Sequence, residues 1–134
     1  MKVFTLVADL EPGAGGTMLL TGSHRLLERF GRTQPADVLA KNARARRALL
    51  RSHPFFAALR TPGDPADRVE RFMRNDVDVD GVPVRVVDVH GRAGDIWLVH
   101  QSTVHARPTN AGDSPRFMLA KDVFVRAPAV PVPA

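Results

Sequence analysis

Hydrophobic positions along most of the chain recur with the two-residue period of β-strands. In residues 2–10, Phe4, Leu6 and Leu10 fall on one face, and Val3 and Val7 fall on the other. Because both faces are largely apolar, this pattern predicts an interior strand that is covered on both sides. Further short runs, rich in β-branched and other apolar residues, predict strands in segments 17–20, 76–80, 82–89, 96–99, 103–106 and 117–125.

The first two predicted strands are joined by a glycine-rich segment. Residues 11–16 read Glu-Pro-Gly-Ala-Gly-Gly, a composition that indicates a turn. A phosphate-binding loop is disfavoured, because no Lys-Ser/Thr pair follows these glycines. We therefore expect segments 2–10 and 17–20 to pair as a hairpin.

The helical period appears between these strands and the later ones, in an insert covering about residues 24–74. Ser23 is a suitable N-cap for a helix over residues 24–30. Residues 36–50 carry apolar side chains at helical spacing, and short helical pieces are predicted from His53 onward and over residues 68–74. The insert is expected either to shape a substrate pocket or to serve as packing scaffold.

The order of these elements predicts a mainly β domain with inserted helices. A strand, a turn, a second strand, a helical insert and four or five more strands are typical of a sandwich or barrel, here a jelly roll that lacks an edge. We expect the domain to cover residues 1–126, with a frayed Pro/Ala-rich tail over residues 127–134. The alternating apolar runs predict core positions at Phe4, Leu6, Leu19, Val86, Ile96, Leu98, Leu119 and Val123.

Composition narrows the classes of protein that the chain can represent. The 134 residues contain no cysteine, which excludes disulfides and thiolate metal sites. No apolar run approaches the ~20 residues of a membrane span, and no signal peptide is evident, so a cytoplasmic protein is expected. The net charge is +5, and arginines cluster in residues 41–51. We interpret them as a solvated helix face, because no aromatic residues interleave them to stack nucleic-acid bases.

The candidate chemistry lies in residues 91–116, where a Gly-Asp turn precedes His100, His105, Asn110 and Arg116. Imidazole is a common metal ligand, and a guanidinium offers a planar fork that matches a carboxylate. If Arg116 begins a strand, Met118 and Ala120 share its face and leave room for a ligand.

Residues 4–24 and 94–116, about a third of the chain, resemble the C-terminal half of the phytanoyl-CoA dioxygenase family. The resemblance implies a double-stranded β-helix, a cupin-like jelly roll, that uses Fe(II) and 2-oxoglutarate to hydroxylate a small molecule. It implies that His105 is the distal iron ligand and that Arg116 binds the 2-oxoglutarate carboxylate. We expect both side chains to point into one cavity from neighbouring strands. His100 lies at the opposite strand parity to His105 and is not assigned to the metal.

The chain departs from the family pattern in its metal ligands. The family takes two further ligands from a His-x-Asp or His-x-Glu motif before the segment that matches residues 4–10. None of the five histidines here is followed two positions later by Asp or Glu, and Asp9 or Asp95 would lack the adjacent histidine. Iron in such sites needs two imidazoles and a carboxylate. We therefore expect the chain alone not to turn over 2-oxoglutarate.

Three interpretations stay open. The chain is a truncated oxygenase, completed by a missing N-terminal segment that carries the motif and pairs with residues 2–10. Alternatively, it is a catalytically inactive half-domain that binds a small molecule or forms a homo-oligomer through an exposed strand edge. The third interpretation is a cupin-like small-molecule binder that shares only the fold. No motif identifies a substrate.

Overall fold

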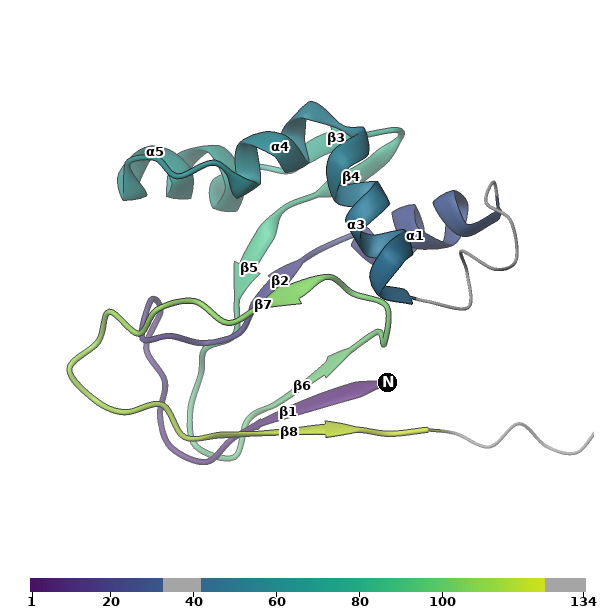
Figure 1. Ribbon diagram of the computed structural model, residues 1–134. Helices are drawn as coiled ribbons and strands as arrows, with labels where there is room; N and C mark the ends of the chain where they lie inside the picture. The colour runs from purple at the N-terminus through teal and green to yellow at the C-terminus, as the bar shows by residue number, and fades with distance from the viewer. Residues whose placement is uncertain (33–41, 125–134) are drawn as a thin grey trace, which may run out of the picture.

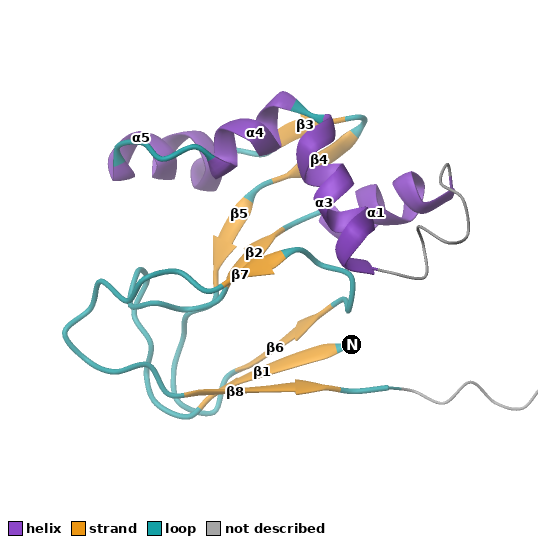
Figure 2. Ribbon diagram, viewed as in Figure 1, coloured by secondary structure: helices purple, strands orange, loops and turns teal. Residues whose placement is uncertain are grey.

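The computed structural model describes residues 1–32 and 42–124. Its strands form two three-stranded antiparallel sheets that face each other and a separate two-stranded hairpin (Figure 1). The first sheet has the order β6-β1-β8, made of β1 (Lys2–Leu6), β6 (Ile96–Val99) and β8 (Met118–Asp122). The second has the order β5-β2-β7, made of β2 (Met18–Leu20), β5 (Val86–Asp88) and β7 (His105–Ala106). The predicted mainly β class with inserted helices is confirmed (Figure 2).

The predicted hairpin of the first two strands is wrong. Strand β1 pairs with β6 on one side and β8 on the other, whereas β2 pairs with β5 and β7 in the opposite sheet. The chain crosses between the sheets through residues 7–17, so the glycine-rich segment is a crossover. Both edges of β1 are occupied, so the expectation that a further segment pairs with this strand is also wrong. The outermost strands are β6, β8, β5 and β7.

The register places one face of each sheet toward the other. Phe4 lies opposite Trp97 and Ala120, and Leu19 lies opposite Val87 and His105. The predicted core positions Phe4, Leu6 and Leu19 are confirmed as buried. The buried cluster between the sheets consists of Phe4, Leu6, Leu10, Leu19, Val89 and Val99.

The prediction is wrong for three other core positions, because the side chains of Ile96, Leu98 and Leu119 are 59%, 65% and 65% exposed. Every position of β6 is apolar, so the sequence does not reveal which side chains point inward. In the structure, Trp97 and Val99 take the inner face. The outer face of the β6-β1-β8 sheet is therefore apolar and exposed, and β1 is not covered on both sides.

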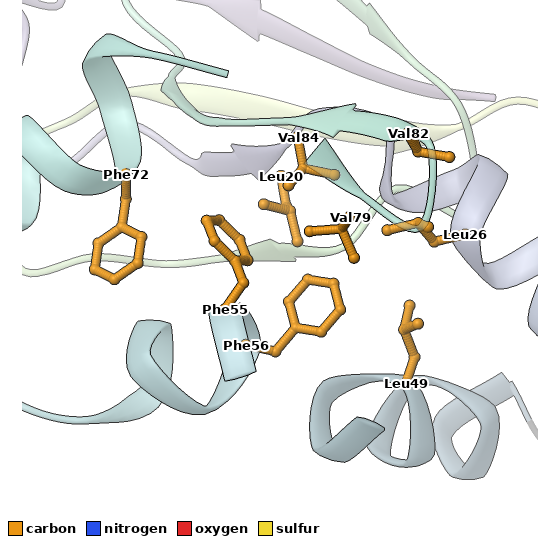
Figure 3. Close-up of a cluster of buried hydrophobic side chains, with 9 residues drawn as sticks. All are labelled: Leu20, Leu26, Leu49, Phe55, Phe56, Phe72, Val79, Val82 and Val84. Carbon is orange, nitrogen blue, oxygen red and sulfur yellow. The ribbon is translucent and has the colours of Figure 1, made fainter. Parts of the chain in front are cut away.

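The helices lie on the outer side of the β5-β2-β7 sheet (Figure 1). A second buried cluster joins them to β2 and to the hairpin of β3 (Val77–Val79) and β4 (Val82–Val84). Figure 3 shows the buried members of this second cluster, Leu20, Leu26, Leu49, Phe55, Phe56, Phe72, Val79, Val82 and Val84. The two remaining predicted core positions are only half-buried: Val86 packs against this cluster, and Val123 follows β8. The helical elements are α1 (Ser23–Arg32), α3 (Asn42–Ser52), α4 (Pro54–Arg60), α5 (Pro65–Val69) and the π-helix η1 (Glu70–Arg74).

Local sequence explains where α4 begins. His53 is its N-cap, with Nδ1 accepting a hydrogen bond from the Phe55 N–H at 3.0 Å, and Pro54 occupies the first turn, where its missing N–H costs nothing. Residues 36–41 of the predicted second helix and the tail 127–134 lie outside the described residues. Within the part of the chain that is described, no helix is long and apolar enough to cross a membrane.

Ser23 has a different role from the predicted helix cap. It is the first residue of α1 and is fully buried. Its hydroxyl donates to the Leu20 carbonyl at 2.6 Å and accepts from the Val104 N–H at 2.9 Å. Ser23 thus ties the start of α1 to the residue that precedes His105, and so helps to fix the position of β7.

Candidate functional site

A cavity of about 330 Å³ lies between the two sheets, and both predicted site residues are in its wall. His105 comes from β7, and Arg116 precedes β8 by two residues. The structure therefore brings them to one cavity, as the sequence analysis expects. They do not come from neighbouring strands, because β7 pairs with β2 and β8 pairs with β1. They approach instead from β7 in one sheet and from the loop that leads into β8 in the other sheet.

His105 is held in one orientation. Its Nδ1 lies 2.9 Å from the Thr103 carbonyl oxygen, and its ring packs edge-on to Phe4 with 6.3 Å between ring centroids. A carbonyl oxygen can only accept, so Nδ1 carries the hydrogen when the imidazole is neutral. This leaves the lone pair on Nε2, which is the atom that can bind a metal or accept a proton.

Arg116 is oriented by the glycine-rich segment 11–16. Its Nη1 donates to the Gly15 carbonyl, and the segment is itself fixed because the Gly13 N–H donates to Asp88 Oδ2 at 2.7 Å. A guanidinium has five N–H donors, so one bond to Gly15 leaves most of the fork for a ligand. Met118 and Ala120 line the same cavity, as the strand parity predicts.

The cavity wall is predominantly cationic. It contains Lys2, Arg107, Arg116 and Lys121, against the one carboxylate of Asp122. Lys2 Nζ lies 2.8 Å from Asp122 Oδ1, and this hydrogen bond holds the pKa of the Asp122 carboxyl below its usual value. The excess of positive charge favours an anionic ligand.

Lys2 and Asp122 also belong to the cavity wall, and neither was predicted from the sequence as a site residue. The sequence signal that could have found Asp122 is the alternation in residues 116–122, which puts its side chain on the same strand face as Arg116 and Met118. Its pairing with Lys2 depends on the contact between β1 and β8.

The described residues do not provide a complete iron site. Within residues 1–32 and 42–124, no group of three or more His, Cys, Asp or Glu side chains is arranged to hold a metal ion. Asp9 accepts from the Ala93 N–H at 2.7 Å, and Asp95 accepts from the Arg92 N–H at 2.8 Å. These two carboxylates hold the turn before β6 and are not in the cavity wall. His105 fits as one ligand, and the other ligands are missing from this arrangement.

His100 lies outside the cavity, in the loop after β6. Its ring packs against His24 of α1 with 4.9 Å between centroids, and its Nε2 is 3.9 Å from Glu28 Oε1. Burial lowers the pKa of His24, as do the neighbouring His100 and Arg25, whereas Glu28 raises it. We therefore expect the contact of His24 in α1 with His100 in the β6–β7 loop to depend on pH.

We expect the protein to lose stability as the pH falls below about 6.5, the pKa of an unfolded histidine. Because folding lowers the pKa of His24, the unfolded chain takes up the proton first, which favours unfolding. The effect is small, since His24 is only partly buried. Urea unfolding at pH 7.5 and pH 5.5 should show a smaller pH difference for His24→Gln than for the unmodified protein. An unchanged difference would contradict this assignment.

A second, larger cavity of about 600 Å³ lies between the helical insert and the outer face of the β5-β2-β7 sheet. Leu59, Phe72 and Met73 line it from the insert, and Leu20 and Val86 line it from the sheet. His105 and Ala106 lie in the walls of both cavities. The insert thus borders an apolar space next to β7, in addition to packing against the sheet.

Comparison of the chain with models of known protein families, with curated protein sequences and with solved structures gives no match. The proposed relationship to oxygenases therefore rests on residues 4–24 and 94–116 and on the cavity geometry.

Proposed function

We propose that this domain is a partial cupin-like jelly roll of the phytanoyl-CoA dioxygenase type, whose cavity binds 2-oxoglutarate. In this proposal Arg116 binds the distal carboxylate, and His105 presents Nε2 as an iron ligand. The observation that carries the proposal is that His105, on β7 of one sheet, and Arg116, in the loop that leads into β8 of the other sheet, line a single cavity.

The path of the chain supports the jelly-roll assignment. Strand β1 lies in the first sheet, β2 and β5 in the second, β6 in the first, β7 in the second and β8 in the first. All of these pairings are antiparallel. A chain that passes between two facing antiparallel sheets in this way is typical of a double-sheet jelly roll.

The chemistry of the cavity supports a small carboxylate ligand. A volume of about 330 Å³ is at the lower end of the range for small-molecule sites. Arg116 can donate two parallel N–H bonds to a carboxylate, which is the strongest and most specific pairing open to either group. The additional cations Lys2, Arg107 and Lys121 raise the local concentration of anions.

The iron part of the proposal requires ligands from outside this arrangement. When bound, Fe(II) supplies the activation of O₂ in enzymes of this type, and it is held there by two imidazoles and a carboxylate. This chain's described residues offer His105, so no catalytic step is assigned to them. Because β1 has no free edge, a further segment or chain that supplied the other ligands by strand pairing would join one of the outermost strands, β6, β8, β5 or β7.

The binding proposal predicts that 2-oxoglutarate raises the unfolding temperature of the protein. The matched control is 2-oxobutyrate, which keeps the 2-oxo acid but lacks the distal carboxylate for Arg116. We expect the rise given by 2-oxobutyrate to be much smaller at equal concentration, because the bidentate contact is lost. Differential scanning fluorimetry without added metal measures the rise in unfolding temperature that each of the two ligands gives. Equal effects of the two ligands, or none from 2-oxoglutarate, would refute the proposal.

A second candidate function is oligomerisation, and a specific observation favours it. The outer face of the β6-β1-β8 sheet exposes Ile96, Leu98 and Leu119, with Val7 and Phe117 beside them. A contiguous apolar surface of this kind commonly marks a contact with another protein. Two copies of this chain could pack these faces together as a sandwich of sheets.

If this face mediates self-association, the double substitution Leu98→Lys with Leu119→Lys should shift the protein to monomer. Two buried charges per copy would lose hydration in the interface without gaining partners. Size-exclusion chromatography with light scattering measures the molecular mass. The control is Val69→Lys, which places a charge on α5, away from the β6-β1-β8 sheet, at a side chain that is 45% exposed. A monomeric unmodified protein, or a dimer that survives the double substitution, would exclude this function for the face.

A further inference from the structure

The glycine-rich segment and the β7–β8 loop lie against each other at one end of the two sheets (Figure 1). The Ala111 N–H donates to the Gly13 carbonyl at 3.3 Å, and Arg116 donates through Nη1 to the Gly15 carbonyl. Gly15 has no room for a side chain, since a β-carbon there would come within 2.8 Å of Asn110 Cβ. The backbone of the segment therefore helps to decide where the Arg116 guanidinium is held.

One side chain of the second sheet contacts this segment on both sides of Gly15. Asp88, at the end of β5, is only 5% exposed. Its Oδ2 accepts a hydrogen bond from the Gly13 N–H at 2.7 Å, a short distance that is typical of a charged acceptor. Its Oδ1 lies beside Gly16, where a β-carbon would come within 2.5 Å of that oxygen. The Asp88 carboxylate thus holds the segment at two points.

The Asp88 carboxylate is unusual for a group that only fills the core. Its Oδ1 is buried and has no hydrogen-bond partner among the described residues. Burying a carboxylate oxygen without a donor costs free energy, and the neighbouring Val87 and Val89 carry no such cost. Buried polar groups that lower stability are often found where a protein positions its functional groups. This points to a role for Asp88 in the adjacent site.

We propose that Asp88 is a positioning residue of the cationic cavity. By holding Gly13 and Gly16, its carboxylate fixes the Gly15 carbonyl, and that carbonyl keeps the Arg116 guanidinium in the cavity wall. Asp88 is not part of the wall, so it acts on a ligand only through the segment. The identity of the ligand as 2-oxoglutarate rests on the proposed function. The ordering of Arg116 is a property of the ligand-free protein.

Replacing Asp88 with alanine removes both contacts and should leave Arg116 less ordered. Nitrogen relaxation of the Arg116 Nε–H in the ligand-free protein measures this order. A ligand would then have to order the guanidinium as it binds. The dissociation constant of 2-oxoglutarate should therefore rise about threefold to tenfold, the range expected for immobilising one long side chain. An unchanged Arg116 order in Asp88→Ala would overturn the proposal.

Two controls separate positioning from a general loss of stability. Leu49→Ala removes a buried side chain from the second buried cluster, on the far side of the β5-β2-β7 sheet, and should leave the order of Arg116 unchanged. Asp88→Asn keeps an oxygen that can accept from the Gly13 N–H, so it should retain most of that order. A loss in Leu49→Ala or in Asp88→Asn as large as that in Asp88→Ala would overturn the proposal.

A reciprocal measurement decides the question if Asp88→Ala does not fold. Coupling between two sites acts in both directions, so removing the Arg116 bond must also loosen the segment. Arg116→Ala should speed hydrogen exchange of the Gly13 N–H. The control is the Gly81 N–H, which donates to Asp78 Oδ1 at 3.0 Å in the β3–β4 turn and should exchange at its usual rate. Equal Gly13 exchange in Arg116→Ala and in the unmodified protein would overturn the proposal.

The same experiments separate the positioning role from the proposed function. If 2-oxoglutarate does not bind, but Arg116 loses order in Asp88→Ala and Gly13 exchanges faster in Arg116→Ala, the proposed function fails and the positioning role stands. If 2-oxoglutarate binds through Arg116, but Asp88→Ala changes neither the order of Arg116 nor the dissociation constant, the positioning role fails alone.

Discussion

Replacing Arg116 with alanine is expected to abolish the stabilisation of the protein by 2-oxoglutarate. Arg116 lines the cavity with most of its donors available, so its planar fork can pair with a carboxylate. Loss of a desolvated contact between a guanidinium and a carboxylate typically costs about 2 to 5 kcal/mol. The dissociation constant of 2-oxoglutarate should therefore rise at least tenfold. Millimolar 2-oxoglutarate would then no longer raise the unfolding temperature measurably.

The measurement compares each variant with and without ligand, because Arg116 also bonds to Gly15 and its removal can lower stability by itself. Arg116→Lys is the first control. It keeps the charge but loses the fork, so a partial effect of 2-oxoglutarate should remain. Arg107→Ala removes another cation of the same wall and should weaken binding only slightly. An undiminished effect of 2-oxoglutarate on Arg116→Ala would place the ligand elsewhere.

Gly16→Ala is expected to destabilise the fold by about 3 kcal/mol or more, because a β-carbon at this position would overlap the Val89 carbonyl oxygen. That oxygen belongs to backbone that is held in place, since the Val89 N–H donates to the Thr17 carbonyl at 3.0 Å. The clash is therefore with main chain, which cannot rotate away as a side chain can. Any relaxation would also displace Asp88, which holds Gly13.

Gly13→Ala is the matched control in the same segment. Gly13 has a φ of +80°, which disfavours alanine, but a β-carbon there would meet nothing within 4 Å. Gly13→Ala should lower the free energy of unfolding by about 1 to 2 kcal/mol, because only the left-handed backbone conformation disfavours alanine there. This is roughly half the loss expected for Gly16→Ala. Urea unfolding of the two variants measures the difference. Equal costs would show that the segment is not packed against Val89 and Asp88 in this way.

Local features of the sequence predict which segments form strands and where the helical insert lies. Alternation, turn residues and the proline after His53 act over a few residues, so they can be read without knowing the fold. The two-residue period of a strand likewise predicts that Met118 and Ala120 share a face with Arg116, and all three line one cavity. The joint placement of His105 and Arg116 followed from family resemblance, and the structure brings them to one cavity.

Strand partners and strand faces required information that the local sequence lacks. Lys2 pairs with Asp122 across 120 positions, and nothing near either residue specifies the other. In β6, four apolar residues in a row fit either face, and the inward choice of Trp97 is set by Phe4 opposite to it. The hairpin expected around the glycine-rich segment failed for the same reason, because turn residues indicate a reversal without fixing which sheet the next strand joins.

We propose that 2-oxoglutarate binds to Arg116 in the cavity that His105 also lines, and side-chain NMR tests this most directly. The Arg116 Nε–H and the His105 ring resonances, assigned by comparison with Arg116→Lys and His105→Gln, would be followed during titration with 2-oxoglutarate. We predict that both signals shift along saturable curves that give the same dissociation constant. A shift of only one signal, different constants for the two, or no shift at saturating ligand would contradict the claim.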